Sequence, residues 1–262
     1  MTTLNLSHDW GFFSCCSVRL HYIIQYFNNE GILPDDVDST FMFEWYKINT
    51  CRDITFDYFT HYNEYGTICF DTSIDYHEGY QYADYSTLKY NDIIPFMTKY
   101  FSPSVEIENK IADIEKKYEL DYNKICVLYY RGNDKNGETE ICGYDEYILF
   151  ARDILKKDPT ICFLIQSDES EFIEEMTLLF PNSIYCKEEI RHMPKKMSTV
   201  DKEMKENIDI FSKNYLAITI IMSKCKYIIC GSGNCSIWIM LYRGNSKNVY
   251  QNIHGKWILN EK

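Results

Sequence analysis

The sequence predicts an α/β fold in which the second half of the chain forms a parallel sheet covered by helices. Short apolar runs alternate with amphipathic helical patterns from residue 125 onward, and this alternation is typical of βαβ units. The composition, 45% hydrophobic and 25% charged over 262 residues, excludes a coiled coil, a collagen and a disordered chain. A chain of this length has room for one large domain or two small ones.

The first half of the chain is only weakly periodic. One helix is clear over residues 16–27, where apolar side chains recur at helical spacing before Gly31. Residues 50–90 are expected to form loops and short elements, and residues 105–120 a charged covering helix. We place a domain boundary near Asp121, which predicts an N-terminal α/β domain over 1–120 and a C-terminal domain over 121–262.

The second half has a regular pattern of apolar strands and helices. Strands are expected at 125–130, 161–166, 183–186, 226–230 and 248–251, and helices at 144–156, 171–180, 207–224 and 236–242. Apolar strands of this kind belong to a sheet that is buried on both faces. Ligands of such sheets bind beyond the carboxyl ends of the strands, so the residues after each strand are the candidate site residues.

The net charge and the cysteine content limit which classes of function are possible. The net charge of −12 argues against a nucleic-acid groove, but leaves room for a local cation that holds one phosphate. No secretory signal begins the sequence and no run of about 18 apolar residues occurs, so we expect a cytoplasmic protein without a membrane span. The eleven cysteines include no CxxC spacing and are expected to be reduced, mostly buried side chains rather than zinc ligands. The sequence does not indicate an oligomeric state.

Two polar loops follow the first two predicted strands. Arg131 and Lys135 lie in a glycine-containing loop, where a guanidinium fork is suited to grip a phosphate; a plain polar loop explains the pattern equally well. Ser167 or Asp168 is expected to cap the next helix. A carboxylate at Asp168 could also accept a hydrogen bond from a base or a ribose.

The fourth predicted strand is followed by a turn of small residues. The run Gly231-Ser232-Gly233-Asn234-Cys235-Ser236 leads into a helix, and such turns let backbone N–H groups meet an anion. A dinucleotide site would need this motif after the first strand, with an acidic residue about 20 positions on. We therefore expect a phosphate or sugar contact of a different fold.

With these motifs in place, the second half resembles the GDP-fucose-dependent fucosyltransferases of the two-Rossmann (GT-B) fold. The likeness is strongest to the core α1,6-fucosyltransferases and the nodulation fucosyltransferase, and more distant to the α1,2-fucosyltransferases. It covers residues 124–251 and rests on the run from Tyr129 to Glu138 with Glu146 and Tyr147, on Ser167-Asp168-Glu169, and on the stretch from Tyr215 to Ser236. The resemblance implies a GT-B-like fold of two Rossmann-like halves. The N-terminal half would face the acceptor, and the C-terminal half would be a parallel nucleotide-sugar-binding sheet.

The resemblance also implies a reaction. It is the inverting transfer of fucose from GDP-fucose to a glycan hydroxyl, with no metal and no cofactor. Arg131 falls on the Arg that grips the donor phosphate, and Lys135 falls on the Lys beside the catalytic acid. Glu138 falls on the catalytic carboxylate if the alignment with the family motif deletes one residue, and Glu140 is the alternative. A positioned base contributes about 10²- to 10⁴-fold in rate, and fixed cations stabilise the departing diphosphate. The donor contacts implied are Tyr129, Arg131, Asp168, Gly231, Ser232, Gly233, Asn234 and Ser236, with Gly11 and Phe12 in a loop before the first helix.

Three positions depart from the family pattern. Tyr129 stands where the family has His, Gly132 where it has a second Arg, and Ile218 where an Asp reads the guanine. These departures keep two alternatives open: a glycosyltransferase of the same fold that uses another nucleotide sugar, and a carbohydrate-binding protein without turnover.

Two further features have both a functional and a plain interpretation. Asp36 and Asp38 spell a DxD triplet, the metal signature of another glycosyltransferase fold, but no apolar strand leads into it and we expect a solvated turn. Aromatic residues make up 16% of the chain, and many lie before residue 105. Sugar rings stack on aromatic rings, so an acceptor platform is one interpretation and core packing the other. The candidate platform residues are Trp45, Tyr46, Tyr58, Phe59, Tyr62, Tyr76, Tyr80, Tyr82 and Tyr85.

Overall fold

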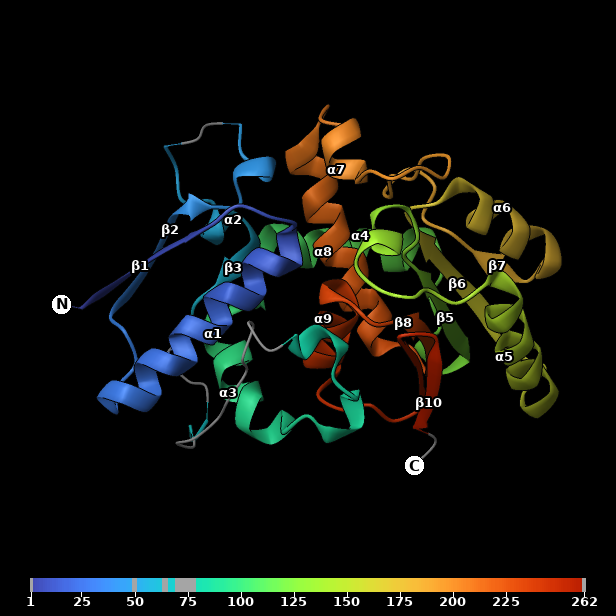
Figure 1. Cartoon of the computed structure of the whole chain (residues 1–262), viewed down its shortest axis with the longest axis horizontal. Helices are drawn as coiled ribbons and strands as arrows, with labels where there is room; N and C mark the ends of the chain where they lie inside the picture. The colour runs from blue at the N-terminus through green and yellow to red at the C-terminus, as the bar shows by residue number, and fades with distance from the viewer. Residues whose placement is uncertain (1, 49–50, 63–65, 69–78, 261–262) are drawn as a thin grey trace.

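The computed structural model describes residues 2–48, 51–62, 66–68 and 79–260. Its centre is a six-stranded sheet in the order β10-β9-β8-β5-β6-β7 (Figure 1). The neighbouring strands are parallel except for the antiparallel pair β9–β10, so the predicted α/β fold with a C-terminal parallel sheet is confirmed. The strands are β5 (Ile125–Tyr130), β6 (Cys162–Ser167), β7 (Ser183–Ile184), β8 (Tyr227–Gly231), β9 (Val249–Ile253) and β10 (Lys256–Asn260).

Strand β5 lies in the middle of the sheet and fixes where the candidate loops emerge. All six of its residues are buried, as expected for an apolar strand with neighbours on both edges. Tyr129 is in register with Gln166 of β6 and with Cys230 of β8. The segments that follow these three strands therefore all leave the sheet at the carboxyl ends of its strands, which is where parallel sheets bind ligands.

Helices connect and cover these strands. In Figure 1, α5 and α6 lie at one end of the molecule and α8 and α9 near its centre. Each helix buries an apolar stripe; in α5 the stripe is Tyr147, Ala151 and Ile154, which recur at helical spacing. The helices of this part are α5 (Tyr144–Lys157), α6 (Ser170–Leu179), α7 (Val200–Glu203), α8 (Ile208–Lys224) and α9 (Asn234–Arg243).

The described residues before 121 form smaller sheets. Strands β1 (Thr3–His8) and β2 (Asp36–Met42) pair in parallel on either side of helix α1 (Phe12–Glu30), and β3 (Phe59–Thr60) pairs antiparallel with β4 (Ser102–Pro103). Two features stay predictions: a full second Rossmann-like half and the domain boundary near Asp121. The remaining elements are α2 (Thr55–Tyr58), α3 (Tyr90–Tyr100), α4 (Val105–Lys117) and the 3-10 turns η1 (Glu44–Tyr46), η3 (Tyr80–Tyr82), η4 (Tyr85–Thr87), η5 (Tyr122–Lys124) and η6 (Asn133–Gly137).

Two sequence-based expectations about this part are wrong. Phe12 does not lie in a loop but is the first residue of α1, because its buried ring extends the apolar face of the helix toward the N-terminus. Asp36 and Asp38 do not form a turn, because both belong to strand β2. This strand owes its conformation to pairing with β1 rather than to an apolar run.

Most of the described cysteines are buried, as predicted. Across the described ranges, each helix is too short or too polar to cross a bilayer.

The two parts of the chain are joined by packing of α1 against α9. The indole of Trp238 on α9 is fully buried and stacks on Phe13 of α1 at a ring-centroid distance of 5.9 Å. Its Nε1 donates to Ser17 Oγ at 2.9 Å, and its ring contacts Phe101 edge-on at 4.9 Å. One side chain thus links α9, α1 and the segment before β4.

Replacing Trp238 by Ala is expected to lower the free energy of unfolding by about 3–5 kcal/mol, because it leaves a cavity at this junction. Urea unfolding followed by circular dichroism measures the change. Trp10→Ala is the matched control, because Trp10 is 58% exposed and surface substitutions usually change stability by only about 0.5 kcal/mol. Equal losses in the two variants would contradict the packing role of Trp238.

Candidate active site

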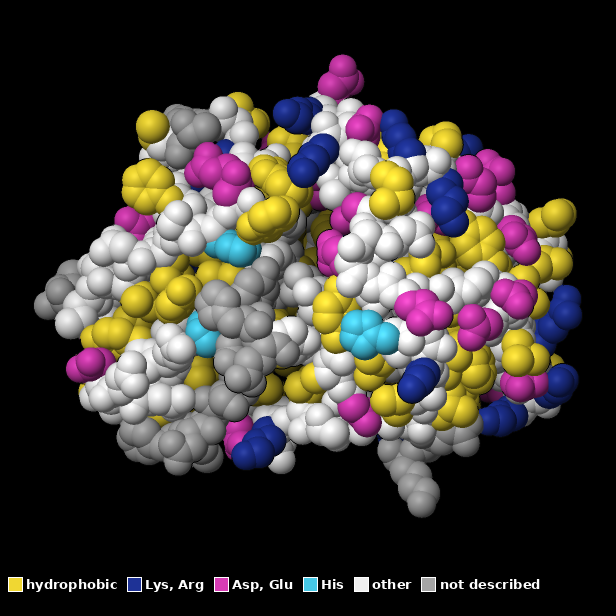
Figure 2. Space-filling view, in the orientation of Figure 1, with side chains coloured by type: hydrophobic (Ala, Val, Ile, Leu, Met, Phe, Trp, Pro, Cys, Tyr) yellow, Lys and Arg dark blue, Asp and Glu magenta, His cyan; other side chains and the backbone are white. Residues whose placement is uncertain are grey.

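A cavity of about 570 Å³ lies at the carboxyl edge of the sheet. Figure 2 shows a hollow near the middle of this face of the molecule. One wall comes from the start of α1 and from η1, and the other from the loops after β5 and β8 and from residues 197–202. Its volume is in the range of small-molecule sites. Of the predicted site residues, it is lined by Gly11, Phe12, Tyr129, Arg131, Lys135, Glu138, Ser232, Gly233, Asn234 and Ser236.

Arg131 stands at the end of β5 and is held by two carboxylates. Its Nε donates to Asp168 Oδ2 at 3.0 Å and its Nη2 to Asp134 Oδ1 at 2.9 Å. The side chain remains 29% exposed, and within the described part of the chain Nη1 has no hydrogen-bond partner. Burial is the largest single influence and lowers the pKa of Arg131, but Asp168, the nearby phenols and Asp134 together outweigh it and raise this pKa above its ordinary value. The result is a fixed cation with one side open to the cavity.

Asp168 positions Arg131 and its loop rather than capping a helix. Its Oδ1 accepts from the backbone N–H of Gly132 at 3.0 Å, and its carbonyl accepts from the Asn133 amide at 2.8 Å. Helix α6 begins after Glu169 without a side-chain cap, so the predicted capping role of Ser167 or Asp168 is wrong. The carboxylate instead joins the ends of β5 and β6, and Asp168 lines a smaller neighbouring cavity.

Gly132 explains one departure from the family pattern. A Cβ atom at this position would lie only 1.9 Å from Glu169 Oε1, so no larger residue fits without displacing Glu169. Glu169 is fully buried and Tyr144 donates a hydrogen bond to it. Burial raises the pKa of Glu169. The space that a second arginine would need is therefore filled by this glutamate.

Lys135 and Glu138 form an ion pair at the rim of the cavity. Lys135, on η6, is mostly buried and packs beside Gly233, whereas the Glu138 side chain is 45% exposed. Lys135 Nζ and the Tyr82 hydroxyl, the latter at 3.1 Å, both donate to Glu138 Oε2. Among the described residues, Oε1 has no partner. Glu140 lines a different, smaller cavity.

The turn between β8 and α9 presents the first turn of a helix to the cavity. Two of its backbone N–H groups are already used: Ser232 donates to Asn252 O at 2.8 Å, and Gly233 to the Tyr85 hydroxyl at 3.3 Å. The N–H groups in the first turn of α9 have no intrahelical acceptor and are the ones suited to an anion. Gly231 does not reach this cavity but lines the smaller one beside Lys135.

Two buried phenols, Tyr129 and Tyr215, line the cavity. Tyr129, at the position where the family has His, lies with its hydroxyl 3.4 Å from that of Tyr215 on α8. Burial raises the pKa of both phenols well above the ordinary value, so both stay neutral near pH 7. Neither can serve as a charged base.

The opposite wall includes the predicted aromatic residues Trp45 and Tyr46, together with Trp10 and a bridge to Asp201 that the sequence did not reveal. Trp10 lies 6.3 Å from Trp45 between ring centroids, and the ammonium of Lys202 is 4.8 Å from the Trp45 ring. The Phe12 N–H donates to the Tyr46 hydroxyl at 2.8 Å, and that hydroxyl donates to Asp201 at 2.7 Å. Trp10, Gln81, Thr199, Asp201 and Lys202 line the cavity without any local motif that could have marked them.

The predicted aromatic platform is only partly present in this cavity. Trp45 and Tyr46 line it, and Tyr82 contacts Glu138 at its rim. Tyr58, Phe59, Tyr80 and Tyr85 are buried in the core, so the core-packing interpretation is correct for them. Tyr62 lies near Lys99 in the first part of the chain, and Tyr76 lies outside the described residues.

Metal ligation is not indicated by the side chains in this region. Within ranges 2–48, 51–62, 66–68 and 79–260, no group of three or more His, Cys, Asp or Glu side chains is placed to hold a metal ion.

No protein-family model and no curated protein sequence matches this chain. Solved structures do. A NodZ alpha-1,6-fucosyltransferase soaked with GDP-fucose matches with a TM-score of 0.40 and 10% identity, over 66% of this chain and 54% of that chain. A NodZ alpha-1,6-fucosyltransferase co-crystallised with GDP matches with a TM-score of 0.41 and 13% identity, over 66% and 53%. The fucosyltransferase NodZ from Bradyrhizobium matches with a TM-score of 0.40 and 12% identity, over 66% of this chain and 53% of that chain. The match spans about half the length of the NodZ chains.

Removing Asp168 tests the positioning of Arg131. Asp168→Ala is expected to lower the free energy of unfolding by about 2 kcal/mol, because the guanidinium and the Gly132 N–H lose a buried acceptor. Asp134→Ala is the matched control and should cost about 1 kcal/mol or less, since that pair is more exposed. Urea unfolding of both variants measures the difference. If the control loses as much stability as Asp168→Ala, the loop is not anchored by Asp168.

Proposed function

We propose that this chain is an inverting glycosyltransferase that transfers a sugar from a nucleoside diphosphate to a glycan hydroxyl, with GDP-fucose as the donor. The observation that supports this most strongly is the placement of Arg131 and Glu138 in one cavity. A fixed guanidinium with an open nitrogen and a carboxylate with an open oxygen meet the two demands of the reaction. The alternation of parallel strands and helices provides the edge on which they meet.

The donor diphosphate would bind Arg131 from the cavity side. Arg131 Nη1 is the open donor of a guanidinium whose other nitrogens are fixed by Asp168 and Asp134, so little side-chain freedom is lost on binding. The first turn of α9 supplies N–H groups on the same side. These fixed positive charges would stabilise the departing diphosphate without a metal ion.

Glu138 would act as the general base. Lys135 and Tyr82 occupy its Oε2, which leaves Oε1 to accept the proton of the acceptor hydroxyl. That oxygen then attacks the anomeric carbon while the bond from this carbon to the diphosphate breaks, and the bonding electrons leave with the diphosphate. Attack from the face opposite the leaving group inverts the anomeric configuration.

The acceptor would enter past Trp10 and Trp45. Trp10 is 58% exposed, although large aromatic side chains are usually buried, and the pair forms part of the cavity wall. The apolar face of a sugar ring stacks on such rings. The glycan would thus contact the N-terminal wall, with the donor on the C-terminal wall.

Two departures from the family pattern support the alternatives. Ile218 is fully buried on α8 and has no polar group for a base, which favours another way of selecting the nucleotide. Neutral Tyr129 and the filled space at Gly132 remove two polar groups from the donor side, which favours a carbohydrate-binding protein without turnover.

Release of GDP from GDP-fucose, with and without a panel of glycan acceptors and with EDTA present, tests the proposal. The wild-type chain is expected to release GDP, faster when a suitable acceptor is added. Glu138→Gln should retain GDP binding and lose about 10²- to 10⁴-fold in transfer rate, because the base is removed. Glu140→Gln is the matched control and should keep its rate. If the transfer rate is lost in Glu140→Gln alone, the base is Glu140. If the wild-type chain turns over no nucleotide sugar, the alternative of a carbohydrate-binding protein without turnover is favoured.

A further inference from the structure

A lysine without a carboxylate partner lines the large cavity. Lys202, an exposed residue of α7, has its ammonium 4.8 Å from the centroid of the Trp45 ring and forms no ion pair within the described part of the chain. The other two cations that line the cavity, Arg131 and Lys135, are each paired with carboxylates. Among the described lining residues, Lys202 is therefore the cation that lacks a negative partner.

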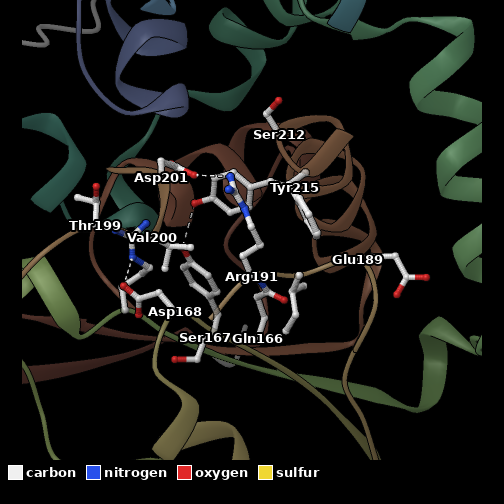
Figure 3. Close-up of a pocket in the computed structure, with 14 residues that line it drawn as sticks. Gln166, Ser167, Asp168, Glu189, Arg191, Thr199, Val200, Asp201, Ser212 and Tyr215 are labelled. Atoms are coloured by element: carbon white, nitrogen blue, oxygen red, sulfur yellow. Dashed lines mark hydrogen bonds and ion pairs between the residues drawn. The ribbon is translucent and has the colours of Figure 1, made fainter. Parts of the chain in front are cut away.

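The carboxylate next to Lys202 in the sequence does not neutralise it. Asp201 accepts from Arg191 Nη2 at 3.0 Å and from the Tyr46 hydroxyl at 2.7 Å, with one bond to each of its oxygens. Figure 3 shows the guanidinium of Arg191 turned toward Asp201. The charge of Asp201 is thus offset by Arg191, and the ammonium of Lys202 lies over a neutral aromatic ring instead of beside a carboxylate.

The segment that carries Lys202 is positive in a protein that is strongly negative. Residues 191–205 include five Lys or Arg and two Asp or Glu side chains, whereas the whole chain has 27 and 39. Both acids are paired inside the segment, Asp201 with Arg191 and Glu203 with Lys196. Figure 2 shows dark blue side chains over α7 and over the segment before it, above the hollow. A cleft with charge of one sign at its rim raises the local concentration of oppositely charged substrates.

An exposed aromatic ring lies close to this cation. Lys202 covers one side of Trp45, whereas Trp10, at a ring-centroid distance of 6.3 Å from Trp45, is 58% exposed and open to a sugar ring. An open ring beside an ammonium suits a sugar that bears a negative group. The donor phosphates would be met by Arg131, which leaves Lys202 for the acceptor.

We infer that the acceptor is an acidic glycan, with one sugar ring packed on Trp10 and a negatively charged group paired with Lys202. This assignment rests on the proposed function, because acceptor and donor share one cavity. The charged group is a carboxylate, a sulfate or a phosphate, which offer the same chemistry to an ammonium. The net charge of −12 makes this preference unexpected from composition alone, since such a protein repels acidic glycans everywhere except at a local cation.

Matched pairs of glycans test the inference by calorimetric titration into protein saturated with GDP. The pairs are a hyaluronan tetrasaccharide and its carboxyl-reduced form, a sulfated lactose and lactose, and a phosphorylated mannobiose and mannobiose. In at least one pair the acidic glycan is expected to bind about fivefold more tightly at low salt, which is the effect of one exposed ion pair. The difference should shrink as salt is added, because salt screens exposed charges. The pair that shows it identifies the charged group.

Variants of two lysines assign the preference to a residue. Lys202→Met removes the charge at similar length and is expected to abolish the preference for the acidic glycan, while the affinities for the neutral glycan and for GDP stay unchanged. Lys247→Met, the same substitution at an exposed position between α9 and β9, is the matched control and should keep the preference. Trp10→Ala should weaken binding of both members of the pair, because both lose the ring on which the sugar packs.

Three results would overturn the inference. They are equal binding within every pair, a preference that survives in folded Lys202→Met, and weaker GDP binding by Lys202→Met, which would assign Lys202 to the donor. Each of these leaves the roles of Arg131 and Glu138 intact. If the wild type instead prefers acidic glycans through Lys202 but transfers no sugar from any nucleotide sugar, the proposed function fails and the acidic-glycan site stands.

Discussion

The ion pair between Arg131 and Asp168 is the interaction on which the candidate site depends. It joins the ends of two neighbouring parallel strands, and the same carboxylate holds the Gly132 N–H, so loop and guanidinium are fixed together. In a protein of net charge −12, an anion needs a local cation, and enforcement of that cation's position reduces the ordering cost of binding. Asp168 and Asp134 provide that enforcement from two sides while one nitrogen of Arg131 stays open.

The other parts of the site follow from this arrangement. Register places Tyr129 of β5 opposite Gln166 and Cys230, so the loops after β5, β6 and β8 meet at one edge. Packing of α1 on α9 through Trp238 brings the N-terminal wall to face this edge. The Phe12 N–H donates to the Tyr46 hydroxyl, and Tyr46 and Arg191 both donate to Asp201, so these hydrogen bonds connect the two walls through the segment before α8. The large cavity and its smaller neighbour are consequences of this packing.

Much of the C-terminal part could be predicted from the sequence, because its strands are apolar runs whose period and length are local properties. Strand β5 has the predicted bounds, the other predicted strands and helices differ by a few residues at their ends, and the short helix α7 was not predicted. Strand β10 was not predicted, because its hairpin turn is His254-Gly255, both with positive φ, in place of an Asn-Gly signal. Helix α3 was not predicted either, since Pro95 interrupts its pattern.

The C-terminal wall of the candidate site was predictable where a loop directly follows a strand. Arg131, Lys135 and Glu138 could be named in this way. Trp10, Gln81 and Arg191 could not, because tertiary packing alone brings them to the two cavities. The same limit explains Asp36 and Asp38, whose strand exists only through its partner β1. Asp168 was named as a ligand contact or a cap, whereas its bonds to Arg131 and Gly132 require the register of two strands.

Calorimetric titration of GDP into wild-type protein and Arg131→Lys tests the central claim most directly. The lysine keeps a positive charge beside Asp168 but loses the guanidinium fork, so a folded variant is the expected product. The account predicts that the wild type binds GDP and that the variant binds about 10- to 100-fold more weakly, the effect of one or more charge-assisted hydrogen bonds worth about 1.5–3 kcal/mol. Equal affinity in the two folded proteins would contradict the role of Arg131, and with it the candidate site.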